Sequence, residues 1–187
     1  MQALYDVLDV FHCEALPHLF RPPDDPIAAR DIVHSIKDPA TVLLIAEVVD
    51  SLAGFLGAKV VEFGPDDTVY LPRRFVYVND MAVLPDFRGR GIGRVLLEAV
   101  EGWARRQGIG AIELTVLEFN EGARVLYERA GFDTLSRRMR RCYDRDTRFP
   151  AARCGGHVRG SGRSCFVPTS PAVSTTNIRY AGRVDDL

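Results

Sequence analysis

The chain has 187 residues, of which 47% are hydrophobic, and its formal net charge at pH 7 is −1. This length and apolar content suit one domain with a well-formed core and exclude a wholly disordered protein. The near-neutral charge argues against nucleic acid or a membrane surface as a general partner, because such partners usually require a basic surplus. We find neither a bilayer-spanning apolar stretch nor a signal-like segment, and therefore expect a cytoplasmic protein.

The four cysteines are scattered, at Cys13, Cys142, Cys154 and Cys165, and predict reduced thiols rather than a disulfide framework. Cys154, His157 and Cys165 fall in one segment, but they lack the paired spacing of zinc sites. We therefore expect no metal ion.

Near the N-terminus, apolar residues recur at helical spacing and predict a helix that ends near Pro17. These residues are Leu4, Leu8, Phe11 and Ala15. A second helix is expected to begin at Asp25-Pro26, because Asp is a favoured N-cap and Pro a favoured first residue. It is expected to end at Asp38-Pro39.

The next part of the chain is rich in β-branched residues. Residues 41–49 and 52–63 predict an antiparallel hairpin with Asp50-Ser51 as its turn. Residues 64–74 are polar and contain proline, which predicts a loop, and residues 75–83 predict the following strand.

The remaining elements alternate between helix and strand. Residues 91–107 predict an amphipathic helix, 111–117 a strand, 121–130 a helix and 132–143 a last strand. This order is typical of an α+β domain.

The turn before the helix at 91–107 is the most informative segment. It contains three glycines and three arginines, which are Arg88, Gly89, Arg90, Gly91, Gly93 and Arg94. Glycines allow close approach to the backbone, and the start of a helix attracts phosphate. The P-loop is excluded because no Lys-Ser or Lys-Thr pair follows, and the dinucleotide fingerprint because the glycines fall at every second position.

The pattern Arg-x-x-Gly-x-Gly at residues 88–93 resembles the pyrophosphate-binding motif of the GNAT acetyltransferase superfamily. Residues 120–132 resemble that family's second signature, Asn-x-x-Ala-x-x-x-Tyr-x-x-x-Gly-Phe. Both motifs occur in the family's order and separation. The resemblance implies the GNAT acyl-CoA N-acyltransferase fold, a mixed and mostly antiparallel sheet flanked by helices.

The resemblance also implies acetyl-CoA as the donor. In this family the fourth and fifth strands splay apart, and the pantetheine arm pairs with the backbone of the fourth strand, here Met81, Ala82 and Val83. The residues implied to hold the pyrophosphate are Arg88, Gly89, Arg90, Gly91, Ile92, Gly93 and Arg94. Asn120 is implied to lie near the cofactor at the end of the fifth strand.

Two catalytic roles are implied. Tyr127 stands where the family commonly places the acid that protonates the departing CoA thiolate, and a phenol of pKa near 10 is protonated at neutral pH. The usual base position holds Asn79, and Asp80 is the nearest carboxylate. Strand alternation would place these two on opposite faces unless a bulge intervenes, so Asp80 is equally a structural residue.

The implied reaction transfers an acetyl group from acetyl-CoA to a primary amine of a small molecule or peptide by direct attack. Candidate acceptor-site residues are His12, His18, Phe20, Arg21, Asp24, Asp25 and His34. Glu14, Asp24 and Asp25 would suit a cationic amine, but the sequence does not distinguish a polyamine, an aminoglycoside, a peptide or a small metabolite. The alternative, from a different functional class, is a non-catalytic acyl-CoA-binding or sensor module. Asn79 supports this alternative because it stands at the usual position of the base.

The family normally begins with a strand, whereas Met1 already falls within the predicted first helix. Residues 177–187 resemble that opening strand, and Leu187 would extend the apolar face of the helix if the two ends were joined. We therefore expect a circular permutant: 1–143 form the catalytic domain without its first strand, 144–175 a flexible connector, and 176–187 the missing strand. The alternatives are an unstructured tail, an altered reading frame beyond Tyr143, and a strand exchanged in a homodimer.

Overall fold

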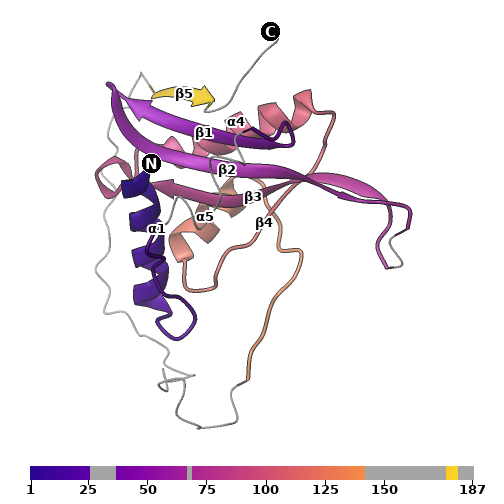
Figure 1. Ribbon diagram of the computed structural model, residues 1–187, viewed down its shortest axis with the longest axis horizontal. Coiled ribbons are helices and arrows are strands. Elements are labelled where there is room, and N and C mark those ends of the chain that lie inside the picture. The colour runs from indigo at the N-terminus through magenta and orange to yellow at the C-terminus, as the bar shows by residue number, and fades with distance from the viewer. Residues whose placement is uncertain (26–36, 67–68, 142–175, 181–187) are drawn as a thin grey trace.

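The computed structural model describes residues 1–25, 37–66, 69–141 and 176–180, in which one sheet carries helices on both faces (Figure 1). The predicted α+β class is confirmed. The second predicted helix, three of the four cysteines and the connector at 144–175 lie outside the described residues. None of the described helices is long and apolar enough to span a membrane.

The first predicted helix is confirmed as α1, Gln2–Ala15. Its N-terminal half packs on the sheet, where Leu4 and Tyr5 are buried. The ring of Tyr5 lies 4.6 Å from that of Phe55, measured between centroids. The C-terminal half extends past the edge of the sheet, so that its apolar side chains are only partly covered (Figure 1).

The predicted hairpin is confirmed as strands β1, Thr41–Val48, and β2, Ser51–Phe63. Its turn lies one residue earlier than predicted, at Val49 and Asp50. Both residues have positive φ, 47° and 60°, as the mirror-image turns that match strand twist require. Turn geometry therefore outweighed the polarity that favoured Asp50-Ser51.

Strand β3, Arg73–Val83, runs antiparallel to β2 and begins two residues before its predicted start. Strand β4, Ile112–Leu114, is shorter than the predicted 111–117 and runs parallel to β3. Their pairing ends at Val78 and Leu114, and beyond that point the two strands diverge.

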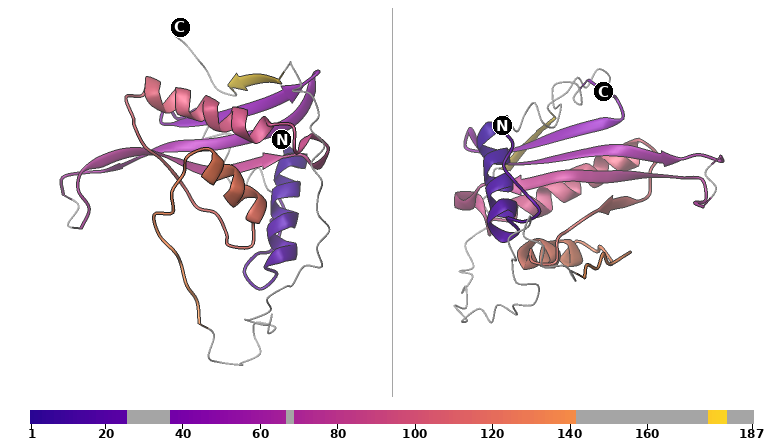
Figure 2. Two further views of the ribbon diagram at one scale, coloured as in Figure 1. Left: turned by 180° about the vertical axis from the view of Figure 1, so that it is seen from behind. Right: turned by 60° about the horizontal axis from the view of Figure 1, so that its bottom comes forward.

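The two predicted helices after β3 are confirmed. A short 3₁₀ turn, η1 (Pro85–Phe87), leads into α4, Ile92–Arg106, and α5 spans Glu121–Arg129. Helix α4 covers the face of the sheet opposite α1, as the two views of Figure 2 show. Its buried residues recur at helical spacing, and these are Ile92, Leu96, Leu97, Val100, Trp103 and Ala104.

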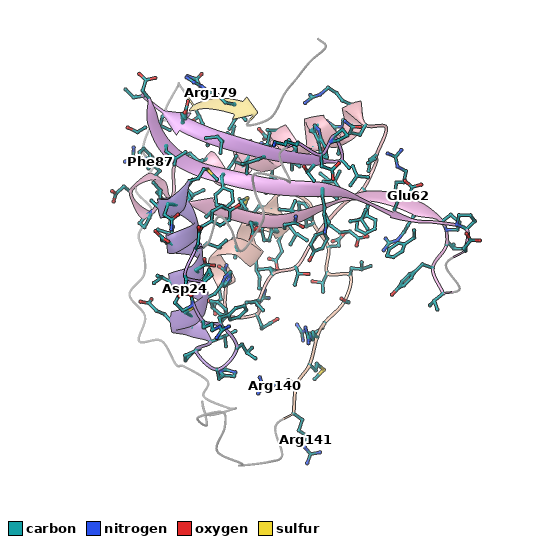
Figure 3. The ribbon with its side chains drawn as sticks, viewed as in Figure 1. Asp24, Glu62, Phe87, Arg140, Arg141 and Arg179 are labelled. Carbon is teal, nitrogen blue, oxygen red and sulfur yellow. The ribbon has the colours of Figure 1, made fainter. Side chains whose placement is uncertain are left out.

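The last strand predicted at residues 132–143 is wrong for its described part, because residues 132–141 contain no strand. Phe132 packs on the core, but Leu135 and Met139 are 77% and 86% exposed. Arginines stand at both odd and even positions of this segment, so neither side could form an apolar strand face. Arg140 and Arg141 lie well away from the sheet (Figure 3).

A fifth strand, β5 (Thr176–Tyr180), runs antiparallel to β1 and completes the sheet order β4-β3-β2-β1-β5. Ile178 packs against the core, and Arg179 forms an ion pair with Glu47 at 2.8 Å. Residues distant in sequence thus lie side by side at this edge (Figure 1). The expected continuation through residues 181–187 toward α1 lies outside the described residues.

Candidate functional site: a gap between two strands

The divergence of β3 and β4 opens one edge of the sheet. Within the described residues, β3 has a ladder partner on its β4 side only at Val76, Tyr77 and Val78. The backbone of Met81 and Ala82 therefore borders the gap, and unpaired backbone groups at such an edge offer hydrogen bonds to an extended polar ligand. A hydrogen bond of 2.8 Å between the hydroxyls of Tyr77 and Thr115 closes the narrow end of the gap.

A β-bulge in β3 changes which side chains face the gap. Gly57 pairs with Asp80 and Ala58 with Val78, so that Asn79 has no partner on β2. Val78 and Met81 both pack toward the α4 face. Because alternation is interrupted between them, Asn79 and Asp80 both project toward the α1 face. The residue at the usual base position and the nearest carboxylate thus lie on one side.

The glycine-rich turn follows directly at the end of β3. Gly89 and Gly91 have φ values of 73° and 82°, a conformation that favours glycine, and Gly91 is the N-cap of α4. Ile92 is buried and anchors the first turn of the helix. The turn therefore places the N-terminus of a fifteen-residue helix beside the open edge of β3, where its N–H groups suit an anion.

The three arginines of this turn differ in role. Arg88 donates from Nε to the carbonyl oxygen of Val83 at 3.0 Å, which ties the turn to β3 and occupies one backbone group expected to contact pantetheine. Arg94 pairs with Glu98 along the helix at 2.8 Å. The guanidinium of Arg90 lies 5.5 Å from the centre of the Phe87 ring, within the turn itself.

Two residues expected at the cofactor also hold α5 in place. A Cβ on Gly93 would lie 2.8 Å from a methyl carbon of Leu126, so the missing side chain lets α5 pack on the start of α4. The side chain of Asn120 accepts a hydrogen bond from the N–H of Ala123 at 3.2 Å and caps α5. Both glycine and asparagine therefore have packing roles that the motif alone did not reveal.

Helix α5 carries Tyr127, whose ring meets that of Phe132 at a centroid distance of 5.8 Å. Burial raises the pKa of Tyr127 to about 12. The structure records no hydrogen bond from its hydroxyl to any described residue. Tyr127 is therefore a protonated donor throughout the neutral range.

Across the gap, an aromatic cluster joins α1 to the segment after β4. Phe11 lies 5.3 Å and His12 6.1 Å from the ring of Phe119, and Phe20 stacks on His12 at 5.3 Å. His12 and Phe20 were predicted as acceptor-site residues, whereas Phe119 was not. Its position one residue before the Asn120 motif was the available signal.

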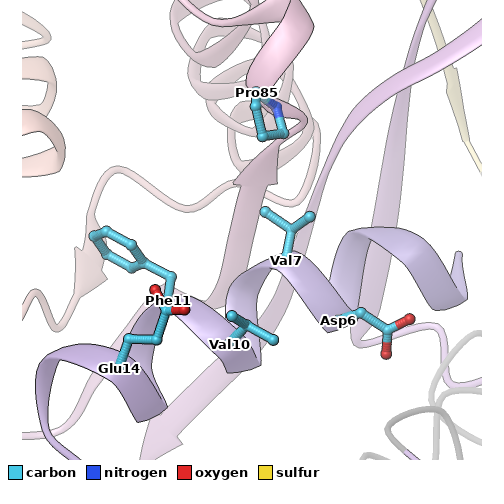
Figure 4. A pocket seen from close by; sticks show the side chains of 6 residues that line it. All are labelled: Asp6, Val7, Val10, Phe11, Glu14 and Pro85. Carbon is cyan, nitrogen blue, oxygen red and sulfur yellow. The ribbon is translucent and has the colours of Figure 1, made fainter.

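A pocket of about 320 Å³ lies between α1 and the end of β3 (Figure 4). Its lining residues are Asp6, Val7, Val10, Phe11, Glu14 and Pro85. Of the other acceptor candidates, Asp24 and Asp25 are exposed in the segment after α1, and His34 lies outside the described residues. The described residues contain no cluster of His, Cys, Asp and Glu that could hold a metal ion.

Residues 3–132 match the model of the acetyltransferase (GNAT) family. A mycothiol acetyltransferase of Propionibacterium freudenreichii is 41% identical over 99 residues, which cover 53% of this chain and 30% of that protein. The chain spans less than two thirds of the length of the curated relatives it matches.

Solved structures share the fold. A tetramutant of the BH1408 protein of Bacillus halodurans has a TM-score of 0.70 at 22% identity, covering 76% of this chain and 91% of that one. The aminoglycoside N-acetyltransferase AAC(6')-Iy in complex with CoA has a TM-score of 0.52 at 20% identity, covering 63% and 86%. Because the family model matches residues 3–132, which are well over half of the sequence, the chain belongs to the acetyltransferase (GNAT) family.

Proposed function

We propose that this protein is an N-acetyltransferase that moves an acetyl group from acetyl-CoA to a primary amine. The observation that carries the proposal is the junction of two features, an open strand edge and a glycine-rich helix N-terminus at its end. Together they suit a ligand with an extended amide-bearing arm and a pyrophosphate. The CoA in the AAC(6')-Iy structure and the aminoglycoside in its name support this donor and this acceptor class.

The donor would lie along the gap. Met81, Ala82 and Val83 would face the pantetheine arm, and the turn from Arg88 to Arg94 would receive the pyrophosphate. Arg88 donates a hydrogen bond and Arg94 forms an ion pair within the chain, whereas the recorded contact of Arg90 is with the ring of Phe87. Because this contact does not neutralise its charge, Arg90 is the arginine best placed to attract the phosphates at longer range.

An alkylammonium must lose a proton before it attacks, which at pH 7 costs about 4–5 kcal/mol for a pKa of about 10.4. The bulge directs Asp80 toward the α1 face, so its carboxylate is the proposed base, with Asn79 positioning the amine or a water. The amine nitrogen then bonds to the acetyl carbon, and the bond from that carbon to sulfur breaks.

Tyr127 would meet the sulfur as the thiolate leaves. Full proton transfer from a phenol of pKa about 12 to a thiolate whose acid has a pKa of about 8.5 is uphill by about 5 kcal/mol. The proposed contribution of Tyr127 is therefore a hydrogen bond that stabilises the thiolate. The thiolate then takes its proton from solvent.

The alternative is a non-catalytic acyl-CoA-binding module. It is favoured by Asn79, which stands at the bulge where the family commonly has a carboxylate. It predicts acetyl-CoA binding without turnover of any amine.

Calorimetric titration with acetyl-CoA tests the donor site. We expect micromolar binding, weakened at least tenfold by Arg90→Glu and little changed by Arg138→Glu, an equal charge reversal in the strandless segment. Absence of binding to the folded wild-type protein would overturn the proposal. If both variants bound acetyl-CoA equally weakly, the effect of Arg90→Glu would come from the change in net charge and not from the position of Arg90.

Thiol release during turnover then separates the enzyme from the binding module. Asp80→Asn should lower kcat/KM and remove the acidic limb of its pH profile. An unaltered pH profile would exclude Asp80 as the base.

A further inference from the structure

We propose that the acceptor is a dication of the diamine type, whose second, non-reacting ammonium group is held by Glu14 in the α1 pocket. This inference rests on the proposed function. It concerns the pocket lined by α1 and Pro85, and it specifies the part of the acceptor that does not react.

The pocket lies at the mouth of the gap between the two diverging strands. Pro85 follows the end of β3 by two residues, and in Figure 4 Val7 points toward it. Phe11, at the other end of the pocket, contacts Phe119 beyond the end of β4. The pocket therefore lies beside the carboxyl end of β3, and the ring of one of its lining residues contacts the segment that follows β4.

The lining combines an apolar floor with carboxylates. Val7, Val10 and Phe11 offer surface to a short alkyl chain, and Phe11 can also face a cation with its ring. Neither Asp6 nor Glu14 has a hydrogen bond or ion pair recorded within the described residues, so their charge is not neutralised there. Such a surface attracts a cation and repels an acceptor that carries a carboxylate.

The two carboxylates lie at opposite ends of the pocket. They are eight residues apart on the helix, which is about 12 Å along its axis. Glu14 and Phe11 lie at the same end of the pocket, whereas Asp6 lies at the other end, nearer the N-terminus of α1 (Figure 4). An ammonium group beside Glu14 would gain both the ion pair and the aromatic face, which favours Glu14 over Asp6.

Charge is also segregated around the gap. Helix α1 contains Asp6, Asp9 and Glu14 but neither lysine nor arginine. The turn before α4, on the donor side, contains Arg88 and Arg90. An anionic donor and a cationic acceptor would thus approach from different sides, and each would be repelled by the other's site.

Direct binding of 1,5-diaminopentane, measured by calorimetry at low salt, tests the site without requiring turnover. The protein should bind the diamine at least tenfold more tightly than pentylamine. Glu14→Gln should remove most of this difference. Glu62→Gln, which removes the same charge beside Arg74 on the distant hairpin, should retain it. Equal binding of the diamine by wild type and Glu14→Gln would overturn the inference.

Acetylation of the same two amines separates this inference from the function on which it rests. In the wild-type enzyme kcat/KM should be at least tenfold higher for the diamine than for pentylamine. Glu14→Gln should lower kcat/KM much more for the diamine than for pentylamine. Phe11→Ala should lower it for both amines. Turnover of pentylamine as efficient as that of the diamine would refute the dication site and leave the acetyltransferase intact, whereas diamine binding without any turnover would refute only the acetyltransferase.

Discussion

The two faces of the sheet differ in how completely they are covered. On the α4 face, a continuous cluster of buried residues joins the sheet to the helix, including Leu44, Leu56, Val76 and Leu96. Among the described residues, the buried cluster on the α1 face has five members, and Phe11 and Phe20, near the C-terminal end of α1, are each 37% exposed. Within the part of the chain that the structure describes, the α4 face therefore contributes more buried apolar surface to stability, and the α1 face leaves more apolar surface accessible.

The largest expected effect comes from opening the better covered face. Leu96 is fully buried, and Leu96→Ala should lower the free energy of unfolding by about 3 kcal/mol, because it removes apolar contacts and leaves a cavity. Urea unfolding followed by circular dichroism measures the change. Leu8→Ala, on the half-covered α1 face, is the matched control and should cost less than half as much; equal losses would refute the contrast between the faces.

A substitution of Tyr127, which packs on the α4 face, tests whether that face also contributes to catalysis. Tyr127→Phe should reduce kcat about a hundredfold, since the leaving thiolate loses its donor, with little change in acetyl-CoA binding. A reduction below threefold would exclude this role.

The same variant has a signature at alkaline pH. The pKa of Tyr127 is about 12 in the folded protein and about 10 when unfolded, so burial favours the protonated form. Its contribution to stability is complete below pH 10 and is lost as pH rises through 12, by about 3 kcal/mol. Denaturant unfolding between pH 9 and 12 should show this extra loss in the wild type and not in Tyr127→Phe; parallel curves would contradict it.

Strand β5 belongs to the better covered face through Ile178. Deleting residues 176–187 should lower the free energy of unfolding by about 2 kcal/mol, because it exposes the edge of β1 and part of the core. The expected circular permutation requires this loss and requires it to be independent of protein concentration. An unfolding midpoint that depends on protein concentration would favour strand exchange, and a midpoint unchanged by the deletion would favour a dispensable tail.

Arg179→Ala is the milder control, because it removes only an exposed ion pair. It should lower the free energy of unfolding by under about 1 kcal/mol.

A smaller expected effect than that of the β5 deletion concerns the cap of α5. Asn120→Ala should cost about 1 kcal/mol, because the N–H of Ala123 loses its acceptor. If Asn120 also contacts the cofactor, acetyl-CoA binding should weaken beyond what Asn120→Asp, which retains the cap, produces. Identical binding by the two variants would limit Asn120 to the cap.

Much of this arrangement was predictable from the sequence alone. The strand, glycine-rich turn and helix of residues 73–106 were predicted within two residues, because helical spacing, β-branched runs and glycines act over a few neighbouring positions. The same local signals located α1, the hairpin and α5. Tyr127 and the turn at residues 88–94 were assigned their expected roles from the resemblance to family motifs, and these roles stay predictions.

Tertiary structure decided the features that depend on partners distant in sequence. The bulge that turns Asn79 and Asp80 to one face exists only in the register of β3 against β2, and the close approach of Gly93 to Leu126 depends on the packing of two helices. The strand expected at 132–143 failed because local β-propensity cannot compensate for a segment with no apolar face to bury. The pocket joins α1 to the end of β3, and no local pattern records which elements meet, because packing free energy depends on all of them at once.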